Sequence, residues 1–185
     1  MEKKIAPSEH KAQALHALLQ GQAEGQSREE LLNALVRLST ERILQEALEQ
    51  EQAVALGRGR YEMRGEKVGY RNGYENGTLK TGEGVLHVKV PQIRGQGGPY
   101  RSQLWQNVGT TSDVLKKLIV EMYVGGMSQR DIEYGLEQAV GQFVLSKRTV
   151  SDITESLAEE YEAFRTRDLK NESIAYLFID TVYEP

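Results

Sequence analysis

The sequence contains no cysteine, so disulfide bonds and thiolate metal sites are excluded, as is typical of a cytoplasmic protein. No apolar run reaches the roughly 18 residues that a membrane-spanning helix needs. Lys3 and Lys4 are not followed by the apolar segment of a secretory signal. With 185 residues, 39% of them hydrophobic, the chain is long enough to bury a core. We therefore expect a globular cytoplasmic protein without a membrane partner.

Positive charge is also scarce, since the sequence has 23 Lys and Arg residues but 27 Asp and Glu residues and its net charge is -4. A nucleic-acid binder needs positive charge, because its affinity depends on neutralising phosphates. The charge is unevenly distributed, however: residues 58–101 hold 9 basic against 4 acidic side chains, and the segments on both sides are acidic. This pattern is common on solvated surfaces, but it is also how an acidic protein presents one phosphate-facing surface.

The stretch from Met122 to Phe164 predicts two capped helices separated by a short break. Ser128, followed three residues later by Asp131, forms a capping box that predicts a helix ending near Gly141. Ser146 caps the second helix. Apolar residues recur there every three or four positions and form one stripe. They are Val150, Ile153, Leu157, Tyr161 and Phe164.

Polar residues at the start of this second helix lie off the apolar stripe and would be free to contact DNA. A recognition helix reads base edges with its N-terminal residues, and arginine is the commonest partner of guanine. The pattern therefore predicts a helix-turn-helix, although two capped helices with an apolar stripe also fit a plain helical hairpin. The polar residues are Lys147, Arg148, Ser151 and Thr154.

Two helices are expected in the acidic N-terminal region. Pro7 and Ser8 begin the first; Ser27 and Glu30 form a capping box for the second, which continues to about Leu56. An apolar stripe without a cluster of ligand-type side chains is more often a core or dimer face than a catalytic one. We therefore expect this region to pack against a partner helix and the protein to be a homo-oligomer.

Glycines from Gly57 to Gly77 predict turns and irregular chain, with arginines and tyrosines between them. The run lacks the Gly-Lys-Ser/Thr sequence of a phosphate-binding loop. Arginine beside aromatic residues in irregular chain suits phosphate contact, although a solvated loop fits equally well.

A β-hairpin is predicted next, with strands at Thr78–Thr81 and Val85–Val90. Pro91 is expected to end the second strand. Because side chains alternate along a strand, His87 and Lys89 are expected to face water or a ligand.

Between the hairpin and Met122, Leu104 and Trp105 are expected to return to the core as an apolar anchor. A helix is then expected from Asp113 to Gly125. It would supply the supporting helix that a helix-turn-helix needs.

Residues 174–180 form a nearly continuous apolar run that ends at Asp180. This pattern predicts a buried central strand with a carboxylate at its carboxyl end. One central strand cannot complete a sheet, so we expect a second domain to begin here.

The motifs together resemble the N-terminal half of a Mutator-type insertion-sequence transposase of the DDE superfamily. Six of them occur in the family's order, and the similarity is clearest from about Tyr70 to Tyr183. They are Tyr70-Arg-Asn-Gly-Tyr74, Thr78-Leu-Lys-Thr81, Val88-Lys-Val-Pro-Gln-Ile-Arg94, Glu121-Met-Tyr-Val-Gly-Gly-Met-Ser-Gln-Arg-Asp-Ile132, Ser146-Lys-Arg-Thr-Val-Ser151 and Leu177-Phe-Ile-Asp-Thr-Val-Tyr183.

The resemblance implies a region that binds double-stranded DNA at terminal inverted repeats, followed by a catalytic domain of ribonuclease-H-like fold. Such a domain holds two Mg²⁺ ions with Asp, Asp and Glu for phosphoryl transfer. Asp180 matches the first catalytic Asp and metal ligand, although Thr181 follows it where many relatives carry Gly or Ala. The expected DNA-binding residues are Arg64, Arg71, Lys80, Arg94, Arg130, Lys147, Arg148, Thr149 and Ser151.

The expected fold is mainly α with a small β-hairpin. Its parts are N-terminal helices (1–56), a basic Gly-rich segment with the hairpin (57–108), a helix-turn-helix DNA-binding region (109–170) and the start of a truncated catalytic domain (171–185).

The second Asp and the Glu are absent from these residues, and one carboxylate cannot hold two ions. We therefore expect no stable Mg²⁺ binding and no strand cleavage by this chain alone. The resemblance predicts a truncated transposase that retains DNA binding in a prokaryotic cytoplasm, on the nucleoid when DNA-bound. A stand-alone regulator or inhibitor of transposition and a purely structural helical protein are the alternatives.

Overall fold

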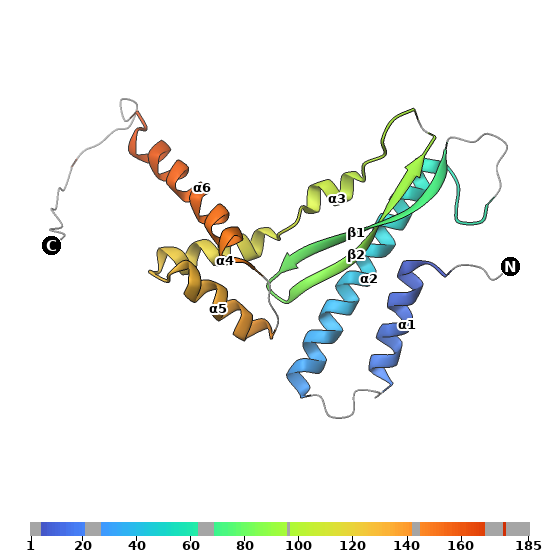
Figure 1. Ribbon diagram of the computed structural model, residues 1–185, viewed down its shortest axis with the longest axis horizontal. Helices are drawn as coiled ribbons and strands as arrows, with labels where there is room; N and C mark the ends of the chain where they lie inside the picture. Colours follow the sequence, from blue (N-terminus) through green and yellow to red (C-terminus); the bar gives the residue numbers. More distant parts are fainter. Residues whose placement is uncertain are drawn as a thin grey trace.

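The computed structural model describes residues 5–20, 27–62, 69–95, 97–141, 145–168 and Tyr176. The fold is mainly helical with one two-stranded antiparallel hairpin, as predicted (Figure 1). The elements are α1 (Pro7–Leu19), α2 (Arg28–Leu56), β1 (Tyr70–Thr81), β2 (Gly84–Arg94), α3 (Gln103–Val108), α4 (Asp113–Val124), α5 (Gln129–Val140) and α6 (Lys147–Arg165). The long α2 runs beside the hairpin, α1 lies against α2, and α4, α5 and α6 gather near the hairpin turn (Figure 1).

The predicted ends of α2 are confirmed. The Ser27 hydroxyl accepts from the Glu30 N–H at 3.2 Å, and the Glu30 carboxylate accepts from the Ser27 N–H at 2.7 Å. These hydrogen bonds, that of the backbone N–H foremost, lower the pKa of Glu30. The helix ends at Gly57, whose φ of 62° is a left-handed conformation that glycine adopts without strain.

Polar side chains of α2 hydrogen-bond the outer edge of β2. The Gln45 amide is buried; it donates to the Lys89 carbonyl at 2.8 Å and accepts from the Lys89 N–H at 2.7 Å. Glu41 accepts from the His87 N–H at 2.7 Å, and Gln52 donates to the Gln92 carbonyl at 3.0 Å. An open strand edge exposes unpaired backbone groups, so these side chains do what a third strand would do.

Carboxylates of α2 also hold the two neighbouring helices. Glu49 accepts from the N–H and hydroxyl of Ser8 at 3.1 and 2.7 Å, which satisfies the first turn of α1. Glu51 accepts from the N–H groups of Gln103 and Leu104 at 2.8 and 3.1 Å and does the same for α3. Both helices therefore take their positions from α2.

The apolar contact between α2 and the hairpin lies behind this polar edge. Leu48 is fully buried against Val88 and Val90, and Leu104 and Trp105 of α3 pack against the same cluster. The predicted apolar anchor at Leu104 and Trp105 is therefore confirmed.

Strand β1 begins at Tyr70, so the prediction of irregular chain up to Gly77 is wrong for its last eight residues. These residues pair with β2 as far as Arg94, and a bulge lies between Arg71 and Tyr74. Gly77 is required there for close packing, because a Cβ on it would lie 2.6 Å from the Trp105 ring. The glycines that suggested a loop therefore lie within a strand, where they permit a bulge between Arg71 and Tyr74 and close contact between Gly77 and the Trp105 ring.

Pro91 does not end the second strand, which continues to Arg94, so this prediction is also wrong. The N–H groups of His87 and Lys89 point away from β1 toward α2. Pro91 follows His87 and Lys89 at the same two-residue spacing. The N–H that proline lacks would therefore have pointed toward α2, so no backbone hydrogen bond to β1 is lost.

The predicted helices from Asp113, Ser128 and Ser146 are confirmed, and they pack around one core. Val85 of the hairpin contacts this core, and so does Ile153 of α6. The packing joins the hairpin turn to the three helices. The buried core residues are Leu115, Ile119, Ile132, Leu136, Leu145 and Val150.

The apolar stripe of α6 is buried at the start of the helix and exposed at its end. Val150 is fully buried, whereas Tyr161 and Phe164 are 62% and 61% exposed. None of the described helices is long and apolar enough to cross a membrane. The predicted strand at 174–180 lies outside the described residues except for Tyr176, and the predicted domain boundaries and homo-oligomer stay predictions.

Replacement of Gln45 by leucine should destabilise the fold by about 2–4 kcal/mol, because it leaves the N–H and C=O of Lys89 buried without partners. Urea denaturation followed by circular dichroism measures the change. Glu46→Ala is the control, since this exposed side chain forms a surface pair with Arg42 that should contribute less than about 0.5 kcal/mol. Equal stabilities of Gln45→Leu and the wild type would contradict the edge-pairing account.

Candidate nucleic-acid interface

The first turn of α5 is fixed by a reciprocal cap. The Ser128 hydroxyl accepts from the Asp131 N–H at 3.2 Å, and the Asp131 carboxylate accepts from the hydroxyl and N–H of Ser128 at 2.6 and 3.2 Å. These hydrogen bonds, that of the hydroxyl foremost, hold the pKa of Asp131 below its ordinary value. The cap leaves Arg130 exposed in the first turn.

The first turn of α6 is cationic. The Ser146 hydroxyl accepts from the Thr149 N–H at 3.3 Å and lies 3.1 Å from the Thr149 hydroxyl. Lys147 and Arg148 follow the cap directly and are exposed, and the first turn holds no acidic residue. Cations are unfavourable at the positive end of a helix dipole, so their placement does not serve helix stability and creates a strongly positive surface.

The first turns of α5 and α6 lie side by side. The Gln129 amide donates to the Ser151 hydroxyl at 3.4 Å, which links the two helices. Between them is a hollow of about 360 Å³ whose lining includes two cations and no carboxylate. The lining residues are Tyr123, Ser128, Gln129, Arg130 and Lys147.

Lys80 of the hairpin joins this surface through its side chain. Its ammonium donates to the Thr149 hydroxyl at 3.3 Å. Its backbone N–H donates to the Thr110 carbonyl at 2.9 Å, and its carbonyl accepts from the Ser112 N–H at 2.8 Å, one residue before α4. Lys80 is therefore fixed to both the start of α4 and the start of α6.

Six of the predicted DNA-binding residues gather at this end of the molecule, and we call them the α5–α6 surface. Residue types at a helix start identify most of them from sequence, but Lys80 comes from a distant strand. Tyr123 and Gln129 also line the hollow and were not predicted; the position of Gln129 directly after a cap could have indicated it. The six are Lys80, Arg130, Lys147, Arg148, Thr149 and Ser151.

Thr154 does not face solvent, so the prediction that it is free to contact DNA is wrong. It is only 6% exposed, and its hydroxyl donates to the Ser151 carbonyl at 3.1 Å. It lies one turn beyond Val150, which is fully buried, and both residues therefore turn toward the core of the three helices.

The remaining predicted residues are not brought to this surface. Arg71 and Arg94 lie at the opposite end of the hairpin, about 30 Å from Lys80 at the usual rise per residue. The Arg71 guanidinium is half-buried and donates to the Arg58 carbonyl at 2.9 Å, and Arg94 is exposed. Arg64 and Asp180 lie outside the described residues.

Among the described residues, no three His, Asp or Glu side chains come close enough to hold a metal ion. The predicted ligand Asp180 is not one of these residues, so the predicted Mg²⁺ site stays a prediction.

The comparisons with known proteins agree with the motifs described above. The sequence model described as "Transposase, Mutator family" matches residues 8–185. The chain belongs to this Mutator family of transposases. Three relatives illustrate the similarity.

The transposase for insertion sequence element ISRM5 of Rhizobium meliloti is 36% identical over 142 residues, which are 77% of this chain and 35% of the relative. The transposase for IS406 of Burkholderia multivorans is 35% identical over 144 residues, 77% of this chain and 36% of that protein. The transposase for IS256 in transposon Tn4001 of Staphylococcus aureus is 31% identical over 123 residues, 66% of this chain and 31% of that protein. This Mutator-family chain thus spans about a third of the length of its curated relatives.

Replacement of Asp131 by asparagine should lower the melting temperature at about pH 7, and the difference in melting temperature from the wild type should vanish in acid. The folded state lowers the pKa of Asp131 below 3.8, so it favours the ionised carboxylate. That contribution is present above the ordinary pKa and is lost as the pH falls through the lowered value.

Thermal melts followed by circular dichroism across this pH range measure the effect. Glu137→Gln, an exposed position on the same helix, controls for the loss of one negative charge. A destabilisation by Asp131→Asn that stays constant down to the lowest pH would contradict the role of the carboxylate.

Proposed function

We propose that the chain binds double-stranded DNA at the terminal inverted repeats of an insertion sequence, with α5 and α6 as a helix-turn-helix. The observation that carries the proposal is the cationic first turn of α6, where Lys147 and Arg148 are exposed beside the exposed start of α5. In this arrangement α6 is the recognition helix and enters the major groove with its first turn.

The surroundings of α6 support this role. Recognition helices read bases with the residues of the first turn, while cations on neighbouring elements hold the phosphates. Arg148 is the candidate base reader because its guanidinium can bind guanine O6 and N7 together. Arg130 on α5 lines a hollow with Lys147, and Lys80 on the hairpin reaches Thr149, so both cations lie at the first turn of α6 and are candidate phosphate contacts.

The similarity to insertion-sequence transposases supports the choice of DNA. Such proteins must recognise the ends of their own element, and the α5–α6 surface is a compact cationic site built from capped helices. The same binding surface would serve a regulator of transposition, so the proposal concerns the interaction with DNA and not the fate of the bound DNA.

Replacement of Arg148 by alanine should weaken binding to a terminal-repeat duplex by about 1–3 kcal/mol and reduce the preference over a scrambled duplex. Lys147→Ala should weaken binding to both duplexes alike and reduce the salt slope by about 1, as for a phosphate contact. Fluorescence anisotropy over a range of salt concentrations measures both effects.

Arg165→Ala is the matched control, because it removes an exposed cation from the far end of the same helix, where Arg165 pairs with Glu162. Its affinity should equal that of the wild type. If Arg165→Ala and Arg148→Ala weaken binding equally, the loss reflects net charge and α6 is not a recognition helix.

Strand cleavage and transfer are proposed for the family's catalytic domain, with Asp180 as the first metal ligand. We propose that the 185-residue chain by itself does not cleave DNA, because Mg²⁺ is bound weakly by a single carboxylate. The expected result is no nicking of a supercoiled plasmid carrying the repeat when Mg²⁺ is added. Metal-dependent nicking that disappears in Asp180→Ala would overturn this part of the proposal.

A further inference from the structure

The hairpin carries a second cationic surface, which adjoins the α5–α6 surface at Lys80. Asn76, Thr78 and Lys80 of β1 alternate with the buried Gly77, Leu79 and Thr81, so they share the outer face of the strand. The cross-strand partners of Asn76 and Thr78 are Lys89 and His87, which are exposed. We call this side the outer hairpin face.

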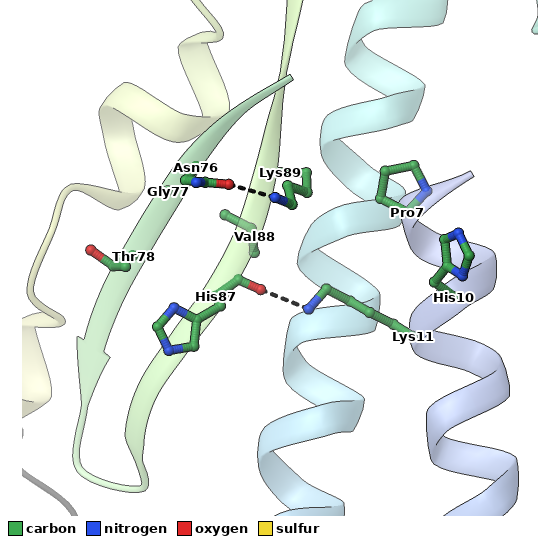
Figure 2. A pocket seen from close by; sticks show the side chains of 9 residues that line it. All are labelled: Pro7, His10, Lys11, Asn76, Gly77, Thr78, His87, Val88 and Lys89. Atoms are coloured by element: carbon green, nitrogen blue, oxygen red, sulfur yellow. Dashed lines mark hydrogen bonds between the residues drawn. The ribbon is translucent and has the colours of Figure 1, made fainter. Parts of the chain in front are cut away.

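The outer hairpin face forms one wall of a groove whose other wall is α1. The groove has two adjoining hollows of about 610 and 590 Å³, which share Pro7, His10 and Lys89. Figure 2 shows the first hollow, with Lys11 of α1 reaching the His87 carbonyl and Lys89 beside Asn76. No acidic residue lines either hollow within the part of the chain that the structure describes.

The charges in this groove are not all compensated by carboxylates. Lys11 pairs with Glu41 at 2.5 Å, so its charge is neutralised. The Lys89 ammonium instead donates to the Asn76 amide oxygen at 2.5 Å, and an amide carries no charge. His87 is exposed next to it. An anion at this place would therefore gain a charged partner without displacing a carboxylate.

The far end of the groove holds arginines close together. Arg60 and Arg71 line the second hollow with Lys89. The pKa of Arg71 is lowered by its burial and by the charge of Arg58. An anion bound among these arginines would offset the desolvation of Arg71 and the repulsion between the like charges.

The outer hairpin face runs along the hairpin toward the α5–α6 surface. Lys80 lies on the outer hairpin face, and its ammonium reaches Thr149 in the first turn of α6. Along this face from Lys80 come His87 and Lys89 and, beyond the buried Pro91 and Ile93, Arg71, about 30 Å away. At 3.4 Å for each base pair, this distance corresponds to about nine base pairs of B-DNA.

We propose that the outer hairpin face binds the phosphate backbone of the same DNA duplex beyond the base pairs that α6 reads. His87, Lys89 and Arg71 contact phosphates at increasing distance from the recognition site, all on one side of it, and Lys80 marks the point where the two surfaces meet. The proposal rests on the proposed function of α6, and it predicts that the footprint extends in one direction only.

The test compares duplexes of different length with the full 185-residue chain. One short duplex holds only the minimal recognition sequence, and two longer duplexes extend it by about ten base pairs of unrelated sequence on one side or the other. In the wild type, extension on one side should raise the affinity about tenfold and steepen the salt slope by about 2, since the two cations Lys89 and Arg71 each add about 0.9. Extension on the other side should leave the affinity and the salt slope unchanged.

The double variant His87→Ala, Lys89→Ala should lose most of the gain from extension. Both side chains are exposed, so the fold should survive, and a thermal melt checks this. Lys116→Ala removes an exposed cation of α4 and should keep the whole gain.

The outcomes separate the two proposals. If the wild type fails to prefer the short recognition duplex over a scrambled one, the proposed function of α6 is wrong. If the wild type shows that preference but extension raises the affinity equally on both sides or on neither side, the outer hairpin face is not a DNA-binding surface. The same conclusion follows if the double variant keeps the full gain in affinity.

Discussion

The fold depends on hydrogen bonds between the side chains of one helix and the edge of one strand. A two-stranded hairpin is marginally stable in water, and its outer edge exposes backbone groups. Gln45 and Glu41 of α2 satisfy those of Lys89 and His87, while Leu48 buries the apolar face behind them. Because α2 also caps α1 and α3 through Glu49 and Glu51, one helix positions three other parts of the molecule.

The hairpin that α2 stabilises also contacts the helices that carry the candidate DNA surface. Its turn packs Val85 into the core of α4, α5 and α6, and Lys80 holds the first turn of α6. The cationic residues of α6 are therefore presented by a helix fixed at its N-terminal end, while Tyr161 and Phe164 beyond the core stay exposed. Rigidity at the first turn is what a base-reading helix requires.

The sequence predicts the features that depend on neighbouring residues. Helix starts at Ser27 and Ser128 follow from a cap and the acidic residue three positions later, the start at Ser146 follows from the cap alone, and all three are confirmed. The length of β1 and the burial of Thr154 depend on contacts with residues far away in the chain, so local patterns miss them. For the same reason, sequence alone identifies Arg148 as a candidate base reader but does not place Lys80 against Thr149 in the same helical turn.

The central claim is that the first turn of α6 lies in the DNA groove, and directed cleavage tests it most directly. The chain has no cysteine, so Asp152→Cys and Thr166→Cys each provide one site for an iron–EDTA tether, about 20 Å apart along α6. With the tether at position 152, strand cleavage should concentrate at one place within the terminal repeat, and with the tether at 166 it should be weak. Equal cleavage from both positions, or cleavage spread evenly along the duplex, would contradict the account.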